Sequence, residues 1–212
     1  MRPILSTFIR NIAPVAAVSL ISASANAAIV FDTLSNTPSS VFFFKGAGGI
    51  LPYQEFGLVM HVPATSDYQL DSLQFSFDLA LQTTTPFELA AFSLGTGTPQ
   101  GSLLTTFSGN LNASSVVGSY TPNTALTLPA GTDVFFRFKV NSAGGSYRVQ
   151  STVDIPGPSD WSFTQSYLGN GTTWTTTFNT PIMQVNATPV PEPGSAALLA
   201  AGTFMLVRRR RA

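Results

Sequence analysis

The chain has 212 residues, with ten basic and ten acidic side chains and no cysteine. Six of the basic residues lie near the two ends, so the stretch from Ala28 to Pro189 carries four basic and nine acidic residues, a formal charge of −5. This balance argues against binding to nucleic acid, which depends on lysine and arginine neutralising phosphates. The lack of cysteine excludes disulfides, thiolate metal sites and cysteine nucleophiles.

Residues 1–27 are predicted to form a secretory signal peptide. Arg2 and Arg10 give a charged start, an apolar stretch runs from Ile12 to Ile21, and Ala-Asn-Ala at 25–27 places small residues at positions −3 and −1 of a cleavage site after Ala27. An N-terminal membrane helix is the alternative. The apolar run is shorter than the about 20 residues that a span needs, however, and it contains a proline.

Residues 28–187 are predicted to form a single all-β domain, an antiparallel sandwich or jelly roll. Apolar residues occupy every second position in Leu73–Leu81 and Val134–Val140, and in Tyr147–Val153 they do so except at Ser151. This is the period of strands with one buried face. In the second of these segments the period assigns Phe135 to the solvent-facing side. No part of the stretch sustains apolar residues at helical spacing.

Turn residues separate the predicted strands. Asn141–Ser146 is predicted to be a hairpin connection, and Asn170-Gly171 is typical of a type I′ hairpin turn. The segment Phe87–Leu94 is strand-like but loses its alternation at Ala90–Ala91, which predicts a bulge. Seventeen phenylalanines are available for the core that disulfides cannot reinforce.

Candidate catalytic residues are few. His61 is the only histidine of the chain, and no G-x-S-x-G motif accompanies it, so we expect a partly buried strand residue rather than a catalytic base. Glu55 and Glu88 are two carboxylates of the kind that a glycosidase needs across a cleft, but nothing in the sequence selects a pair. We therefore expect no enzymatic activity.

Metal binding is also weakly indicated. One histidine and no cysteine exclude an ordinary structural zinc site. Weakly bound calcium stays open, because loops of β-sandwiches offer carboxylate and carbonyl oxygens. The candidate pairs are Asp67 with Asp71 and Asp154 with Asp160, and neither has EF-hand spacing. Solvated loop carboxylates are the favoured interpretation, so no cofactor is expected.

Aromatic residues in polar surroundings are the best sequence indication of ligand binding. Trp161 and Trp174 lie in or beside predicted loops, and Tyr120 and Tyr167 lie among polar residues. Exposed aromatic rings stack on sugars, which makes Trp161 and Trp174 candidate ligand-binding residues. For Trp174 the favoured alternative is packing across the Asn170-Gly171 hairpin, where it would close one end of the sandwich.

Residues 188–212 combine a linker, an apolar run and a basic end. Pro191-Glu192-Pro193 is followed by fourteen uncharged residues, Gly194–Val207, and then by Arg208, Arg209, Arg210 and Arg211. The run is short for a transmembrane helix, but arginine side chains that reach the interface allow a short span in a thin bilayer. Four basic residues beside such a span orient the C-terminus toward the cytoplasm.

The order of these parts, from Val190 through Pro191, Glu192 and Pro193 to Arg211, resembles the PEP-CTERM sorting signal of Gram-negative bacteria. The resemblance implies that an exosortase, a membrane processing enzyme, recognises the tail and that the chain is cut near the Pro-Glu-Pro motif. It further implies an intermediate anchored in the inner membrane, followed by transfer to the cell surface or the exopolysaccharide matrix. A simple C-terminal tail anchor is the alternative.

A second resemblance covers most of residues 28–187. Tyr68–Leu73 (YQLDSL) and Leu128–Phe136 (LPAGTDVFF) are similar to a choice-of-anchor domain of the R type. In that family one extracellular β-sandwich is joined to different surface anchors, and the resemblance implies no catalytic residue.

Three functions are therefore compared. The first is a non-catalytic exported surface or matrix protein that is sorted by an exosortase and associated with exopolysaccharide or biofilm. The second is a lectin-like carbohydrate-binding module, and the third, the least favoured, is a secreted hydrolase.

Overall fold

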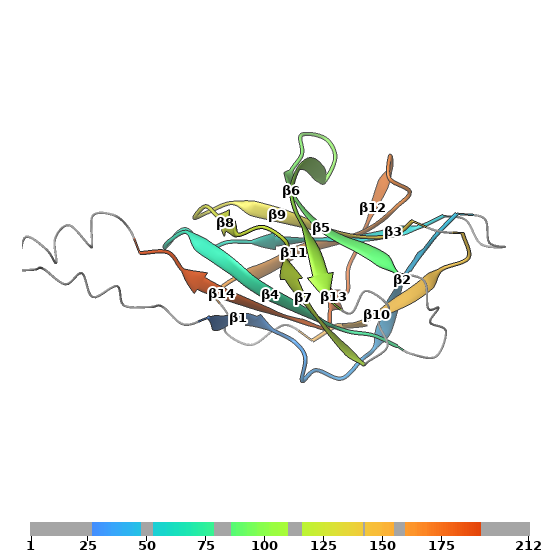
Figure 1. Cartoon of the computed structure of the whole chain (residues 1–212). Helices are drawn as coiled ribbons and strands as arrows, with labels where there is room; N and C mark the ends of the chain where they lie inside the picture. Colours follow the sequence, from blue (N-terminus) through green and yellow to red (C-terminus); the bar gives the residue numbers. More distant parts are fainter. Residues whose placement is uncertain are drawn as a thin grey trace, which may run out of the picture. The chain divides into compact units, whose positions relative to one another are not determined.

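The structure is a computed structural model that describes residues 27–47, 53–78, 86–109, 116–141, 143–154 and 160–191 (Figure 1). These residues belong to one compact unit, Ala25–Glu192. The predicted signal peptide and the predicted sorting helix with its arginines lie outside the described residues. None of the described residues forms a helix of the length and apolarity that crossing a membrane requires.

The described residues are all-β, as the alternating pattern predicts, and every strand pairing among them is antiparallel. The strands are β1 (Ala28–Asp32), β2 (Ser40–Lys45), β3 (Glu55–His61), β4 (Tyr68–Ser76), β5 (Phe87–Leu94), β6 (Gln100–Gly109), β7 (Val117–Pro122), β8 (Leu126–Leu128), β9 (Asp133–Val140), β10 (Ser146–Thr152), β11 (Ser162–Gly169), β12 (Trp174–Thr177), β13 (Thr180–Pro181) and β14 (Met183–Pro189).

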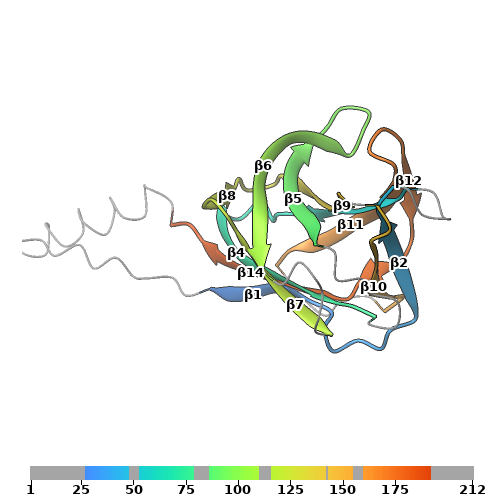
Figure 2. The same cartoon turned by 45° about the vertical axis from the view of Figure 1, so that its right-hand side comes forward.

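One large sheet curls until its two halves face each other. Its strand order is β1-β14-β4-β7-β6-β5-β9-β3-β11-β12, with β8 paired to β4. Strand β6 joins the halves, because it pairs with β5 along most of its length and with β7 at Phe107–Gly109. The bend of β6 over the unit is visible in Figure 2. The result is sandwich-like, with Phe75 of β4 meeting Phe138 of β9 edge to face at 4.7 Å.

A small sheet of order β13-β10-β2 flanks the large one. Isolated bridges connect Lys45 to Gln54, next to β3, and Phe77 to Val149, just after β4. Phe44 of this sheet lies 5.4 Å from Phe138 and 5.3 Å from Tyr147, measured between ring centres. The small sheet therefore shares the core of the large one.

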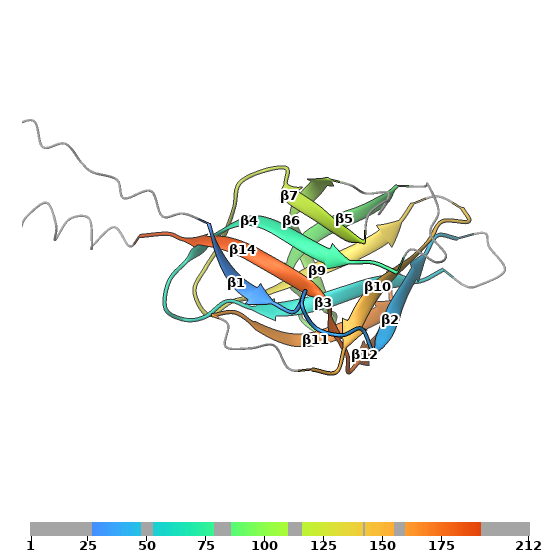
Figure 3. The ribbon, with the colours of Figure 1, turned by 90° about the horizontal axis from the view of Figure 1, so that it is seen from below.

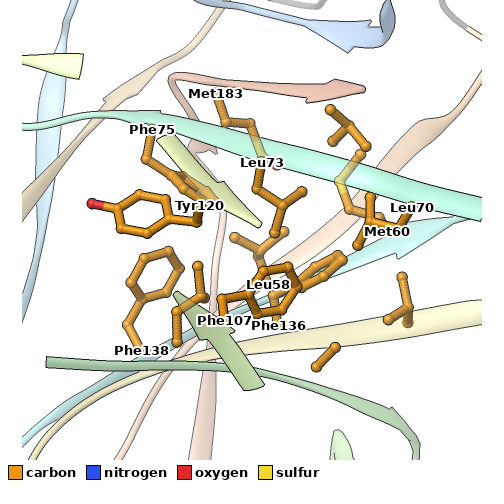
Figure 4. Packing of buried hydrophobic residues seen from close by; sticks show 14 of the residues in the cluster. Leu58, Met60, Leu70, Leu73, Phe75, Phe107, Tyr120, Phe136, Phe138 and Met183 are labelled. Carbon is orange, nitrogen blue, oxygen red and sulfur yellow. The ribbon is translucent and has the colours of Figure 1, made fainter. Parts of the chain in front are cut away.

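The main core lies between the two halves of the large sheet. Figure 4 shows Leu73 and Phe75 of β4 pointing toward Leu58, Phe136 and Phe138 of the facing half. The inward set predicted for β9 is confirmed, since its members are all buried in this core: Val134, Phe136, Phe138 and Val140. Each fully buried side chain of this size contributes about 1.5–3 kcal/mol relative to exposure, which explains how the unit holds together without disulfides.

Three predictions about exposed or inward positions are wrong. Phe135, predicted to face solvent, is fully buried in a second cluster on the opposite face of the sheet. Tyr120, expected among polar groups, is also buried in the main core. Val153, predicted on the buried side, is exposed because β10 ends at Thr152.

The irregular strand Phe87–Leu94 has a physical explanation. Leu89 and Ala91 face the main core, whereas Ala90 and Phe92 belong to the second cluster, so the strand is buried on both sides and loses its alternation. The register between β5 and β6 shifts between Ala91 and Phe92. The bulge predicted here thus exists, but the extra residue lies on the partner strand β6.

Two turn predictions need correction. The segment Asn141–Ser146, of which residue 142 lies outside the described residues, does not connect paired strands, because β10 pairs with β2 and β13 rather than with β9. The β11–β12 hairpin is confirmed, but its turn is centred one residue later than predicted, on Gly171 and Thr172. The amide of Asn170 donates to the carbonyl of Thr173, and Gly171 has a positive φ of 87°, the conformation that favours glycine at this place.

The two ends of the described chain lie side by side. Strands β1 and β14 pair with Ala28 opposite Ala187, and Figure 3 shows β14 lying between β1 and β4. The chain therefore enters and leaves the unit at the same end.

Candidate functional site

The outer face of the second half-sheet carries an unusual mixture of rings and charges. We define the outer face as the side of β5, β9, β3 and β11 that points away from the main core. Cross-strand registers align Ala90, Arg137, Gly57 and Tyr167 in one row across these four strands. The next row contains Phe92, Phe135, Val59 and Gln165.

Trp174 of β12 folds back onto this face. Its ring meets Phe135 edge to face at 5.1 Å between centres, and Tyr167 meets Phe135 at 6.1 Å. A Cβ added to Gly57 would lie 2.3 Å from the Phe135 ring, and one added to Gly169 would lie 2.4 Å from the indole. The absence of side chains at these two glycines therefore makes room for the rings. The packing alternative for Trp174 is correct, but the residue covers the outer face rather than closing an end.

A charged pair borders the rings. Arg137 donates to a carboxylate oxygen of Glu88 and, at 3.3 Å, to the side-chain oxygen of Gln100. The guanidinium also lies over the Phe92 ring at 4.8 Å, in cation–π geometry. Only 13% of the Arg137 side chain is exposed, so the pair is partly desolvated and fixed in position.

Glu55 is the buried acid of this face. Its exposed fraction is 1%, and the hydroxyl of Tyr53 donates to its Oε1. Gly171, in the turn between β11 and β12, lies over the carboxylate, since a Cβ there would be 3.4 Å from Oε1. Burial, followed by the hydrogen bond to Glu55 and its negative charge, raises the pKa of Tyr53 well above its ordinary value.

Two buried polar atoms of this face have no hydrogen-bond partner among the described residues: Oε2 of Glu55, an acceptor, and Nε of Arg137, a donor. Most buried polar side-chain atoms in folded proteins are paired, so such atoms call for an explanation. One part of this site has a signal in the sequence, because Glu55 directly precedes the run FGLVM at positions 56–60. In β3, residues 55–60 are all buried. The proximity of Arg137 has no such signal.

His61 and Asp133 form a separate pair at the end of the outer face. Nδ1 of His61 lies 2.8 Å from Oδ1 of Asp133, and Ser162 is opposite His61 in register. The side chains of His61 and Asp133 are 42% and 34% exposed, and no hydrogen bond joins His61 to Ser162 among the described residues. His61 is thus the partly buried strand residue that was predicted, with an acidic partner that sequence spacing did not reveal.

The surface position expected for Trp161 is wrong. Its exposed fraction is 0%, and its ring packs edge to face against Tyr68 at 5.8 Å. The surrounding sequence is polar, but the fold brings the ring into the main core. Trp161 offers no free ring face for a sugar, so of the two predicted ligand-binding residues only Trp174 stays a candidate.

Three of the four carboxylates considered for calcium accept hydrogen bonds from other residues. Asp67 accepts from the amide of Ala130 at 2.9 Å, and Asp71 accepts from the hydroxyl of Thr188 at 2.7 Å. Asp154 accepts from the hydroxyl of Thr152 at 3.1 Å. Within the part of the chain that the structure describes, no three metal-ligating side chains come together.

The start of the predicted sorting signal is described as far as Pro191. The amide of Val190 donates to the carbonyl of Asp67 at 2.8 Å, and Pro191 is exposed. Glu192, Pro193 and the arginines at 208–211 lie outside the described residues.

No protein-family model matches the chain, and no match is found among curated proteins. The two family resemblances of the sequence therefore stay predictions.

Proposed function

We propose that this protein is a non-catalytic exported protein of the cell surface or extracellular matrix, sorted through its C-terminal segment and associated with exopolysaccharide. One observation carries the proposal. Strand β1 begins at Ala28, directly after the predicted signal-peptide cleavage site, and β14 ends at Pro189, directly before Pro191-Glu192-Pro193. A complete folded unit thus fills the interval between the two predicted targeting segments, as expected of a delivered cargo.

In this proposal the three C-terminal parts have separate roles. An exosortase of a Gram-negative cell recognises Pro191, Glu192 and Pro193. The two prolines favour an extended, non-helical backbone in this motif. The segment Gly194–Val207 holds the intermediate in the inner membrane as a short helix, and the arginines stop its transit. The folded unit is a sandwich of the choice-of-anchor type.

A lectin-like role is the second candidate, favoured by the partly exposed Trp174 ring beside the buried charges of the outer face. It is compatible with the first role, since a matrix protein has to be retained by something in the matrix.

The sorting proposal is tested by the size and location of a tagged chain. An epitope inserted in the exposed loop Gly95–Pro99, between β5 and β6, leaves both ends of the unit free. With Pro191, Glu192 and Pro193 replaced by alanine, the chain should accumulate uncut in the inner membrane, while the control Asp160→Ala should mature like the parent. Equal maturation of the alanine variant would show instead that the tail is an ordinary anchor.

A further inference from the structure

We propose that the outer face binds a sugar residue of an extracellular polysaccharide, through Glu55, Arg137 and Trp174. This inference rests on the proposed association with exopolysaccharide and names the site and the ligand class responsible for it.

The two buried atoms without a partner have complementary hydrogen-bonding needs. Oε2 of Glu55 needs a donor and Nε of Arg137 needs an acceptor. The other polar contacts of both side chains are made with Tyr53, Glu88 and Gln100. Hydroxyl groups both donate and accept, so the hydroxyls of a sugar match both atoms, whereas an ammonium group matches only the acid and a carboxylate only the arginine.

Glu55 and Arg137 lie on the same face of adjacent strands. Arg137 lies opposite Gly57 in the β9–β3 ladder, and Glu55 is two residues before Gly57, so its side chain points to the same face. Diagonal neighbours of this kind lie about 7 Å apart. The acceptor and the donor therefore belong to one site on adjacent strands rather than to two unrelated defects.

The indole ring of Trp174 lies near these two polar groups. Gly169 pairs with Glu55 on one side and with Trp174 on the other. Because Gly169 has no side chain, the indole lies over it, and Gly169 is the register partner of Glu55. Trp174 and Tyr167 are both partly exposed. An apolar ring next to a few fixed polar groups is the usual composition of a ligand site.

The turn between β11 and β12 covers the polar atoms. Gly171 lies over the Glu55 carboxylate, and all four residues of the turn, 170–173, are exposed. Strand β12 lies at the end of its sheet and, among the described strands, pairs only with β11. In this proposal the edge hairpin shifts outward on binding, so that a hydroxyl of the sugar reaches the carboxylate beneath Gly171.

The experiment is affinity electrophoresis of the purified full chain in gels that contain dextran, hydroxyethyl cellulose or alginate. The parent should be retarded by at least one of these polymers. Arg137→Lys keeps a positive charge for Glu88 but removes Nε, and Glu55→Gln removes the anionic acceptor. Each change should weaken retardation about tenfold or more, which is the usual effect of losing a hydrogen bond to a charged group. Trp174→Phe should weaken it as well.

Matched controls keep the outcome interpretable. Phe178→Ser removes an aromatic ring that is 94% exposed and lies outside the face, and Asp160→Asn neutralises an exposed carboxylate; both should bind like the parent. Near-UV circular dichroism shows that each variant is folded, and if Glu55→Gln does not fold, Arg137→Lys decides.

Two results would overturn the inference. One is that no polymer retards the parent, and the other is that Arg137→Lys and Glu55→Gln bind as tightly as the parent, in which case a buried water satisfies both atoms. Either result leaves the sorting experiment unaffected. Conversely, binding in the gel together with failure to reach the surface would reject the proposed function alone.

Discussion

Replacing Gly57 by alanine tests whether the outer face is packed as tightly as the geometry indicates. The new Cβ would lie 2.3 and 2.4 Å from two carbons of the Phe135 ring and 3.2 Å from the Trp174 indole. Phe135 is fully buried and the Trp174 ring lies against Gly169, so neither ring can move away without losing packing contacts. Overpacking of this kind destabilises the folded state by about 1–3 kcal/mol. Replacing glycine also reduces the flexibility of the unfolded chain, which stabilises the folded state by about 0.4–1 kcal/mol.

We therefore expect Gly57→Ala to lower the free energy of unfolding by about 1–2 kcal/mol, or the melting temperature by about 2–8 °C for a domain of this size. The assay is urea unfolding followed by tryptophan fluorescence. In the double variant Gly57→Ala/Phe135→Leu, the smaller leucine makes room for the new methyl group. The free energy of unfolding that the double variant loses should therefore be at least about 0.5 kcal/mol smaller than the sum of the two single-variant losses. The reasoning fails if Gly57→Ala is as stable as the parent, or if the two losses are additive.

Three other outcomes are expected. Trp161→Phe should lower the free energy of unfolding by about 1–3 kcal/mol, because it leaves a cavity in the core, yet retardation in polysaccharide gels should not change; a selective loss of binding would contradict the burial argument. A fluorophosphonate probe should not label the chain at Ser162, and labelling that disappears in His61→Ala would instead establish a serine hydrolase. Stability should fall as the pH rises above about 10, since a raised pKa in the folded state favours folding only while the tyrosine keeps its proton. This loss of stability at high pH should be smaller in Tyr53→Phe but not absent, because burial also raises the pKa of Tyr120. A pH profile of stability identical to that of the parent would count against the buried Tyr53–Glu55 contact.

The sequence predicts strands well where one face of the strand is buried and the other is exposed to solvent. The segment Val134–Val140 alternates, and its four inward residues are all in the main core. The same period cannot say whether the second face is later covered. Here β12 folds back over β9, so Phe135 is buried although its position in the pattern is polar.

The sequence pattern also does not predict which distant segments pair. Residues 141–146 look like a hairpin turn, but β10 pairs with β2, which lies about a hundred positions earlier, because Phe44 and Tyr147 stack in the core. Trp161 has polar neighbours in sequence, and only the fold brings Tyr68 to it. The Glu55–Arg137 site escaped sequence analysis for the same reason, since no local spacing relates β3 to β9.

The position of β14 also determines how the unit bears mechanical load. A tether attached to its C-terminal end pulls on a strand that lies between β1 and β4, so the hydrogen bonds on both sides are loaded in shear together rather than opened one after another. Where the force enters, two further hydrogen bonds hold the strand end: Thr188 donates to Asp71, and the amide of Val190 donates to the carbonyl of Asp67. A unit held by this end while its outer face grips a polymer would resist extraction by flow better than one suspended from an edge strand.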